Sequence, residues 1–212
     1  MGSPNRLTDP LDLIADTSAV INLNATGRAR EILRAIPNRF LVVDVVSAEL
    51  EQGRRRGRAD ADLLHELVAE GLVEIVSMDE SAASHFERLA VGPAVQTLDD
   101  GEAATIAYAA SRETIAVIDE RKATRLCAEQ FPATRISCTV DILAHPEVGR
   151  KLGQQALAEA VFNALQQGRM RVLPQHFRWV VELIGPVKSN LREPSECSSA
   201  ASPKCLREGR AD

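Results

Sequence analysis

Short runs of Val, Ile and Leu alternate along the chain with longer stretches in which apolar residues recur every three or four positions. The short runs predict five strands, at Leu11–Ala15, Arg39–Val43, Leu72–Val76, Thr114–Ile118 and, most weakly, Thr134–Ile136. The longer stretches predict helices at Arg28–Ile36, Ala59–Ala69, Glu80–Leu89, Glu102–Ser111 and Arg121–Gln130. Such alternation is typical of βα units, so we expect a compact α/β fold around a mainly parallel sheet of about five strands.

The pattern changes beyond residue 150. Two helices, Gln155–Gln167 and Gln175–Ile184, are expected there without a further strand, and Gly168 and Pro174 separate them. The sequence therefore predicts a main domain over residues 9–150 and a helical extension over 151–186 that packs on it. Ser, Pro, Lys, Arg and Glu then dominate the composition, so residues 187–212 are expected to be disordered.

Composition narrows the class of protein. The chain has 212 residues, with 25 Lys and Arg against 30 Asp and Glu, which excludes a polybasic protein that holds nucleic acid by overall charge. It has no apolar run of eighteen residues and no pattern typical of a signal peptide at its start, so we expect a soluble, cytoplasmic protein without a membrane span. The four cysteines form no CxxC pair, which favours reduced structural thiols.

Two carboxylates follow predicted strands. Asp16 comes after the first strand and precedes two small hydroxyl residues, and Asp119 comes after the strand that ends at Ile118. The carboxyl ends of parallel strands form the edge at which α/β sheets open their binding crevices. If the two strands are neighbours, Asp16 and Asp119 face one cleft.

Two further acids lie on predicted helices whose first turns could open onto the same edge. Glu49 lies on a short helix in which Val46 and Leu50 point inward, and Glu102 opens an alanine-rich helix after Asp99-Asp100-Gly101. Each acid alone has a structural explanation as a helix cap, a dipole partner or a solvated side chain. Together on one edge they would repel one another, a cost that is usually retained to bind divalent cations.

Oxygen ligands of this kind favour Mg²⁺ or Mn²⁺ over zinc. A divalent cation polarises a phosphate and lowers the pKa of an attacking water, so the cluster is suited to phosphodiester hydrolysis.

Four motifs in this order resemble those of PIN-domain ribonucleases, and in particular the VapC-like toxin branch. They are Ile14-Ala15-Asp16-Thr17-Ser18, Ser47-Ala48-Glu49-Leu50, Leu98-Asp99-Asp100-Gly101-Glu102-Ala103 and Val117-Ile118-Asp119-Glu120. The resemblance covers about Leu11 to Leu143. It implies a three-layer α/β/α domain, and a helical extension is compatible with that branch.

The resemblance also implies roles for individual residues. Asp16, Glu49, Glu102 and Asp119 match the catalytic quartet that binds one or two Mg²⁺ or Mn²⁺ ions, and Ser18 or Thr17 matches the hydroxyl that orients the first Asp. Family members cleave single-stranded or loop RNA, and many toxins are held inactive by a small antitoxin protein. Which of Asp99 and Asp100 reaches the metal, and whether Glu120 is an alternative ligand, stays open.

Basic residues near the acids are candidates for RNA binding. Arg54, Arg55, Arg56 and Arg58 form a dense cluster after the Glu49 helix, and Arg121, Lys122 and Arg125 form a second strip after Asp119. A solvated loop between Gly53 and Gly57 is the alternative explanation of the first cluster. With only 7 aromatic residues, binding by base stacking is not expected.

These observations predict a metal-dependent endoribonuclease, the toxin of a toxin–antitoxin pair. The alternatives are a PIN-like RNA-processing nuclease without an antitoxin and a PIN-like module that binds RNA or protein without cleaving. An apolar stripe around Trp179 on the last predicted helix is explained by core packing or, alternatively, by a contact with an antitoxin or with a second copy in a homodimer.

Overall fold

The computed structural model describes residue 7 and residues 11–185. The tail predicted to be disordered, residues 187–212, lies outside the described residues, as do Cys197 and Cys205 and the first residues of the predicted main domain. Cys127 and Cys138 are buried free thiols, as is compatible with the structural role expected for them.

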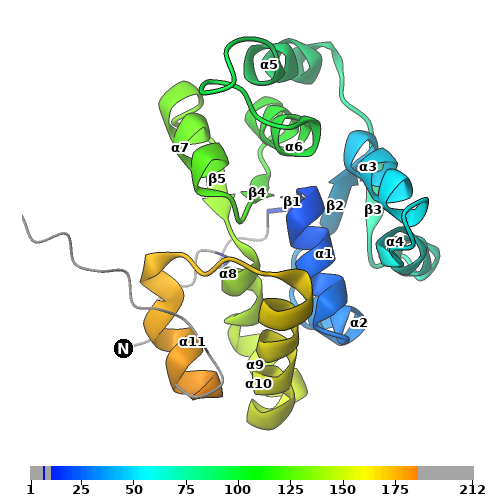
Figure 1. Cartoon of the computed structure of the whole chain (residues 1–212), viewed down its shortest axis with the longest axis vertical. Coiled ribbons are helices and arrows are strands. Elements are labelled where there is room, and N and C mark those ends of the chain that lie inside the picture. Colours follow the sequence, from blue (N-terminus) through cyan, green and yellow to red (C-terminus); the bar gives the residue numbers. More distant parts are fainter. Residues whose placement is uncertain (1–6, 8–10, 186–212) are drawn as a thin grey trace, which may run out of the picture.

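Five parallel strands form the central sheet, in the order β3-β2-β1-β4-β5 (Figure 1). They are β1 (Leu13–Ala15), β2 (Phe40–Val43), β3 (Glu74–Val76), β4 (Ile115–Val117) and β5 (Arg135–Ser137). Leu13 of β1 pairs with Phe40 on one side and with Ile115 on the other. The first and fourth strands are therefore neighbours, which is the arrangement that brings the ends of β1 and β4 to one place.

Eleven α-helices lie within the described residues. They are α1 (Thr17–Ala25), α2 (Ala29–Ala35), α3 (Asp44–Arg54), α4 (Asp60–Ala69), α5 (Glu80–Ala90), α6 (Asp100–Ser111), α7 (Arg121–Gln130), α8 (Thr139–Leu143), α9 (Pro146–Leu152), α10 (Gln154–Asn163) and α11 (Phe177–Ile184). A π-helical segment, Ala164–Gly168, continues α10, and a 3-10 turn, Pro174–His176, precedes α11.

Both faces of the sheet are covered, because successive side chains of a strand point to opposite faces. Leu13 and Ala15 belong to a core shared with α1, α2, α4 and the C-terminal helices, whereas Ile14 belongs to a core shared with α5, α6 and α7. Figure 1 shows α5, α6 and α7 on one side of the strands and α8 to α11 on the other. Burial on both faces explains why the strands read as continuous apolar runs.

The C-terminal helices share the main core. Leu157, Val161, Met170 and Val180 are buried in the same cluster as the strand residue Leu13. Trp179 packs against this cluster as well, so core packing accounts for the apolar stripe around this residue. The predicted division at residue 150 falls inside α9.

The predicted α/β architecture is confirmed, and the differences in detail have local causes. The last strand lies one residue later than predicted, and the expected helix Gln155–Gln167 changes to π-helical geometry at Ala164. The sequence pattern did not indicate α8, because five residues are too few to display a helical period. Asp99 caps α6, since its side chain accepts a hydrogen bond from the Glu102 N–H.

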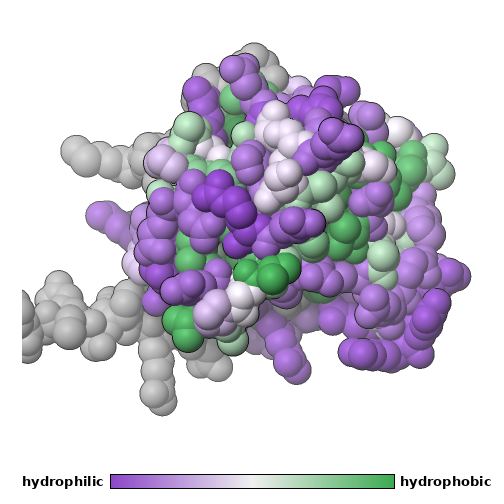
Figure 2. All heavy atoms as spheres, turned by 90° about the horizontal axis from the view of Figure 1, so that it is seen from above, coloured by the Kyte–Doolittle hydropathy of each residue, from purple (hydrophilic) through white to green (hydrophobic). Residues whose placement is uncertain are grey.

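The surface is mainly polar. On the face seen in Figure 2, hydrophilic residues dominate and hydrophobic residues form separate patches. Among the described residues, the exposed large hydrophobic side chains are Ile75, Val91 and Val95. No described helix combines the length and the apolar character that crossing a membrane requires.

Candidate metal centre

A cleft of about 300 Å³ opens at the carboxyl edge of the sheet. All four acids of the predicted quartet line it, although they come from the ends of β1 and β4 and from helices α3 and α6. Its described lining residues are Asp16, Thr17, Ser18, Ile21, Asn22, Glu49, Asp99, Glu102, Asp119, Glu120, Gly168, Arg169 and Arg171.

Asp16 is buried at the point where β1 ends and α1 begins. Its Oδ1 accepts a hydrogen bond from the Ala19 N–H at 2.7 Å, and its Oδ2 accepts one from the Ser18 hydroxyl at 2.8 Å. Asp16 therefore also caps α1, as its sequence context allows. The two hydrogen bonds hold the carboxylate in one orientation at the floor of the cleft.

Asp119 is buried beside Asp16 and is held by three donors. Oδ1 accepts from the Thr139 N–H at 2.8 Å, and Oδ2 accepts from the Thr139 hydroxyl and from Asn22 Nδ2, each at 2.6 Å. Thr139 opens α8 and Asn22 lies on α1, so elements on both sides of β4 orient this carboxylate. Asp119 does not cap α7, which begins after Glu120.

Glu49 is half-buried and joins three elements. One carboxylate oxygen accepts a hydrogen bond from the Thr17 hydroxyl, and the other accepts one from the Gly101 N–H at 2.9 Å. A Cβ atom on residue 101 would lie 2.5 Å from Glu49 Oε2 and 2.7 Å from Thr17 Oγ1. Gly101 therefore allows α6 to approach Glu49 more closely than any other residue would.

The Thr17 and Ser18 hydroxyls contact different carboxylates. Ser18 donates to Asp16, whereas Thr17 donates to Glu49. Either hydroxyl was a candidate for orienting the first Asp, and in this structure the contact with Asp16 is made by Ser18.

Burial raises the pKa values of all four carboxyls, and neighbouring negative charges add to the effect. Burial, followed by the charge of Asp119, raises the pKa of Asp16 well above its usual range. Burial likewise raises the pKa of Asp119 and of Glu49. Burial and the charge of Asp99 raise the pKa of Glu102 to about 7. A divalent cation would remove this repulsion and take only oxygen ligands here, so these residues fit such an ion.

The predicted basic residues do not line the cleft. Arg54 pairs with Asp62 at 2.9 Å and Arg58 with Asp60 at 3.0 Å, near the start of α4, and Arg55 and Arg56 are exposed. Arg121 is exposed at the start of α7. Lys122 donates to the Ala94 carbonyl at 2.7 Å, and its charge lowers the pKa of Glu102.

Sequence reasoning missed five polar or glycine residues that line the cleft or hold one of its acids. Asn22 and Thr139 hold Asp119, and Gly168, Arg169 and Arg171 reach the cleft from the C-terminal extension. Thr139 follows a weak strand, and the same edge-of-sheet argument that selected Asp119 could have selected it. Nothing in the local pattern placed the other four at the carboxyl edge.

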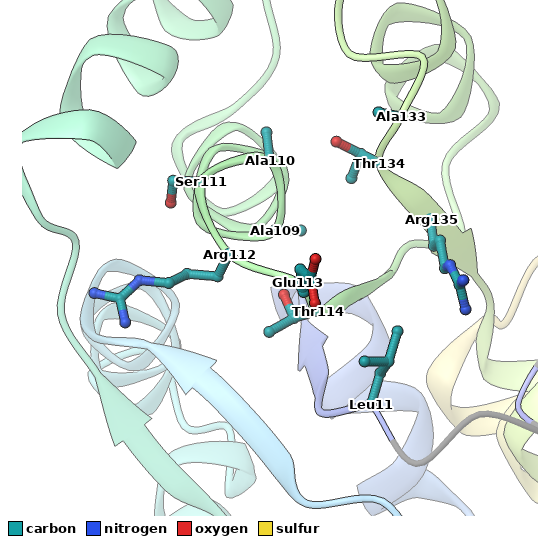
Figure 3. Close-up of a pocket in the computed structure, with 10 residues that line it drawn as sticks. All are labelled: Leu11, Ala109, Ala110, Ser111, Arg112, Glu113, Thr114, Ala133, Thr134 and Arg135. Carbon is teal, nitrogen blue, oxygen red and sulfur yellow. The ribbon is translucent and has the colours of Figure 1, made fainter.

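A larger cavity, of about 460 Å³, lies at the opposite edge of the sheet (Figure 3). It is formed by residues that precede β1, by the end of α6 and by the segments that enter β4 and β5, including Leu11, Arg112, Thr114 and Arg135. One carboxylate, Glu113, lines it, so it has no cluster comparable to the quartet.

Cys138, Asp141 and His176 form a separate buried group, whose potential ligand atoms lie within 4.8 Å of one another. His176 Nε2 lies 3.2 Å from Asp141 Oδ1, and Cys138 Sγ lies 3.3 Å from Asp141 Oδ2. Burial and the charge of Asp141 raise the pKa of the Cys138 thiol far above its usual range. Cys138 therefore keeps its proton, and the group links the C-terminal extension to α8.

The comparisons with known proteins agree with the geometry of the first cleft. A family model described as a PIN domain matches residues 12–186, a range that includes both the sheet and the C-terminal helices. No curated protein matches the chain. A parallel five-stranded sheet with this acidic cleft and a match over most of its length together show that the chain belongs to the PIN-domain family, which has a nuclease fold whose members are generally metal-dependent hydrolases.

Proposed function

We propose that the protein is a metal-dependent endoribonuclease that hydrolyses RNA phosphodiester bonds in the acidic cleft. The observation that carries this proposal is the convergence of four carboxylates, Asp16, Glu49, Glu102 and Asp119, from four separate segments of the chain. Burial raises the pKa of each of these carboxyls, and keeping them together is costly without a cation, whereas a divalent cation that activates water needs such oxygen ligands. PIN nucleases act on RNA, which supports RNA as the substrate.

In this proposal the four carboxylates hold one or two Mg²⁺ or Mn²⁺ ions. When bound, such an ion polarises the phosphate and lowers the pKa of the attacking water. The protein holds its ligands in place before substrate arrives: Ser18 orients Asp16, Thr17 and Gly101 orient Glu49, and Thr139 orients Asp119.

Water, and not a protein side chain, is the proposed nucleophile. The two hydroxyls of the cleft, on Thr17 and Ser18, both donate hydrogen bonds to carboxylates, and the described lining of the cleft includes no histidine. The proposed reaction is an in-line attack on the phosphorus, with the leaving oxygen opposite the water.

We further propose that the protein is the toxin of a toxin–antitoxin pair and works in the cytoplasm, held inactive by a small antitoxin protein. The support is the order of the four motifs, which resembles the VapC-like branch. An RNA-processing nuclease without an antitoxin, or a module that binds without cleaving, would have the same fold. Copurification of a small partner with the tagged protein from its own cells separates a toxin from an RNA-processing nuclease. Gel filtration of the pure chain tests for a homodimer.

The exposed arginines after α3 and the basic residues of α7 are proposed as outer contacts for RNA, beyond the cleft itself. Replacing Arg54, Arg55 and Arg56 with Ala should weaken RNA binding and flatten its dependence on salt concentration, because fewer counterions are released. An unchanged salt slope would remove this cluster from the interface.

The decisive experiment is cleavage of a mixed pool of structured RNA by the purified protein in Mg²⁺, Mn²⁺ or EDTA, with Asp16→Asn purified in parallel. We expect cuts that need the metal and are absent from the variant. Full cleavage by Asp16→Asn would contradict the assignment of the site. If wild type cleaves nothing in any metal, a titration of Mn²⁺ against the two proteins separates a narrow RNA target from a binding-only domain.

A further inference from the structure

The C-terminal extension contributes a positively charged wall to the acidic cleft. Arg169 and Arg171 are the basic residues among the described residues that line it, together with six carboxylates. Both arginine side chains are exposed, and that of Arg171 is 65% accessible. Neither residue was predicted from the sequence, and neither has a role in holding the proposed cation.

The backbone that presents these arginines is shaped by close packing. A Cβ atom on residue 168 would lie 2.5 Å from Asn22 Oδ1 and 3.1 Å from Asn22 Cα, so only Gly allows the π-helical segment to lie this close to α1. Because the glycine is used for packing inside the helix, the left-handed residue that ends the helix is Arg169, with φ 58°.

A left-handed conformation is unusual for arginine and is normally taken by glycine at this position of a helix end. Among the described non-glycine residues, Arg169 is the one with positive φ. Non-glycine residues in this conformation concentrate at functional sites, where the surrounding structure maintains them. Here the strained residue lines the cleft that holds the candidate metal ligands.

The buried residue between the two arginines anchors the segment that presents them. Met170 is buried in the core, and its N–H donates to the Ala164 carbonyl at 3.0 Å. Arg169 and Arg171, on either side of this anchor, are both exposed at the cleft. Arg171 also pairs with Glu120, which follows the proposed ligand Asp119.

The charges of the cleft explain what these arginines could bind. An RNA strand brings phosphate anions to a cleft lined by six carboxylates, so its approach is favoured by every positive charge there, from the proposed cation and from these arginines. Guanidinium groups bind phosphates through paired N–H donors. The ion pair of Arg171 with Glu120 is solvent-exposed, so a phosphate can replace the carboxylate at little cost.

We propose that Arg169 and Arg171 bind backbone phosphates of the RNA strand at the mouth of the cleft, so that the C-terminal extension is part of the substrate site. Glu120 holds Arg171 in position while no RNA is bound. This inference rests on the proposed function for the identity of the substrate, but it concerns binding and not cleavage.

The test measures binding of a fluorescein-labelled single-stranded RNA of random sequence over a range of salt concentrations. The variants are Arg169→Ala, Arg171→Ala, Arg171→Lys and the double alanine variant, each in the Asp16→Asn background so that the RNA stays intact. Arg178→Ala is the matched control, because Arg178 is an exposed arginine of the same extension that pairs with Glu182 outside the cleft.

We expect each alanine variant to bind RNA about tenfold more weakly than the control. The slope of log affinity against log salt should fall by about 0.7 for each lost phosphate contact. Arg171→Lys should keep the slope, because it keeps the charge. Binding and slopes equal to those of Arg178→Ala, or no RNA binding by the parent protein, would overturn the proposal.

A glycine variant separates substrate binding from a structural role. Arg169→Gly removes the strain of the left-handed residue, so its thermal midpoint should rise while its affinity for RNA falls. A fall in both the thermal midpoint and the RNA affinity would indicate that Arg169 stabilises the fold and does not bind RNA, which would contradict the proposal.

Failure of the nuclease assignment would give a different result. Arginine-dependent RNA binding by a wild-type protein that never cleaves would leave this inference standing and reject the proposed function. Metal-dependent cleavage, with RNA binding that is unchanged when both arginines are replaced, would support the proposed function and reject this inference.

Discussion

Asn22 and Asp119 are 97 residues apart in the chain, yet Asn22 Nδ2 donates a 2.6 Å hydrogen bond to Asp119 Oδ2. The contact crosses from α1 to the end of β4, and both side chains are buried. On its other side Asn22 meets Gly168 of the C-terminal extension. One amide thus connects a proposed metal ligand to the extension, and a change in the packing of the extension is expected to reach the site through it.

The two buried aspartates should respond differently to amidation. Asp16→Asn keeps an oxygen for the Ala19 N–H and relieves repulsion, so this variant should be at least as stable as the metal-free wild type while losing cleavage. Asp119→Asn also loses cleavage, but an amide cannot accept from three donors in the same way, and we expect a loss of about 1–3 kcal/mol. Thermal melts in EDTA, with cleavage assays beside them, check both expectations. Equal stability of the two variants would contradict this account of Asp119.

Thr139 should act by positioning Asp119. Thr139→Val keeps the size of the side chain and the backbone N–H, but removes the hydroxyl that donates to Asp119 Oδ2. Because a hydrogen bond to a charged group is lost in a buried place, we expect a cost of roughly 2 kcal/mol and weaker binding of Mn²⁺. Thr139→Ser is the control and should restore metal affinity. If Thr139→Val binds Mn²⁺ as wild type does, the hydroxyl has no part in orienting the ligand.

Gly101 should tolerate no side chain, because it lies against Glu49 and Thr17. The added methyl group of Gly101→Ala would meet the Glu49 carboxylate at 2.5 Å, so α6 or Glu49 must move. We expect a loss of about 1–3 kcal/mol and a strong fall in activity. Gly149→Ala is the matched control, since the nearest atom to its methyl group would be Leu157 Cδ2 at 3.9 Å. That helical substitution should stabilise the protein by about 0.5–1 kcal/mol. A neutral Gly101→Ala would show that the close approach is not required.

The metal-free protein should lose stability as pH rises through the range in which Glu102 ionises. The pKa of Glu102 is raised from 4.5 to about 7, so between these pH values the folded state binds more protons than the unfolded state. Stability conferred by this group is therefore present below pH 4.5 and declines up to about pH 7.

A bound cation should reverse this trend, because it replaces the protons. We expect Mg²⁺ or Mn²⁺ to raise the thermal midpoint more at pH 8 than at pH 5. Melts in EDTA and in metal across this range measure both effects, and Glu102→Gln should flatten the curve in EDTA. An equal metal-induced shift at the two pH values would argue against carboxylate ligands with raised pKa values.

The sequence by itself determined the strands, most of the helices and the acids that follow the strand ends. Apolar runs such as Phe40–Val43 are local signals, and a parallel sheet requires the ends of its strands to share one edge. With the order of the four motifs, this was enough to predict the family and to propose the quartet, and the fold class and the family are confirmed.

Only the tertiary structure decided which neighbours complete the cleft. The contacts of Asn22 with Asp119, of Gly101 with Glu49 and of Gly168 with α1 join segments that are far apart in sequence. Arg169 and Arg171 reach the acids because the C-terminal extension packs on the same core as β1. No local pattern contains such contacts, because the free energy of a side chain at a site depends on the three-dimensional packing that surrounds it. The sequence pattern indicated the clustered arginines around Arg55 as candidates for RNA binding. The arginines that line the cleft are instead Arg169 and Arg171, at the end of the π-helical segment.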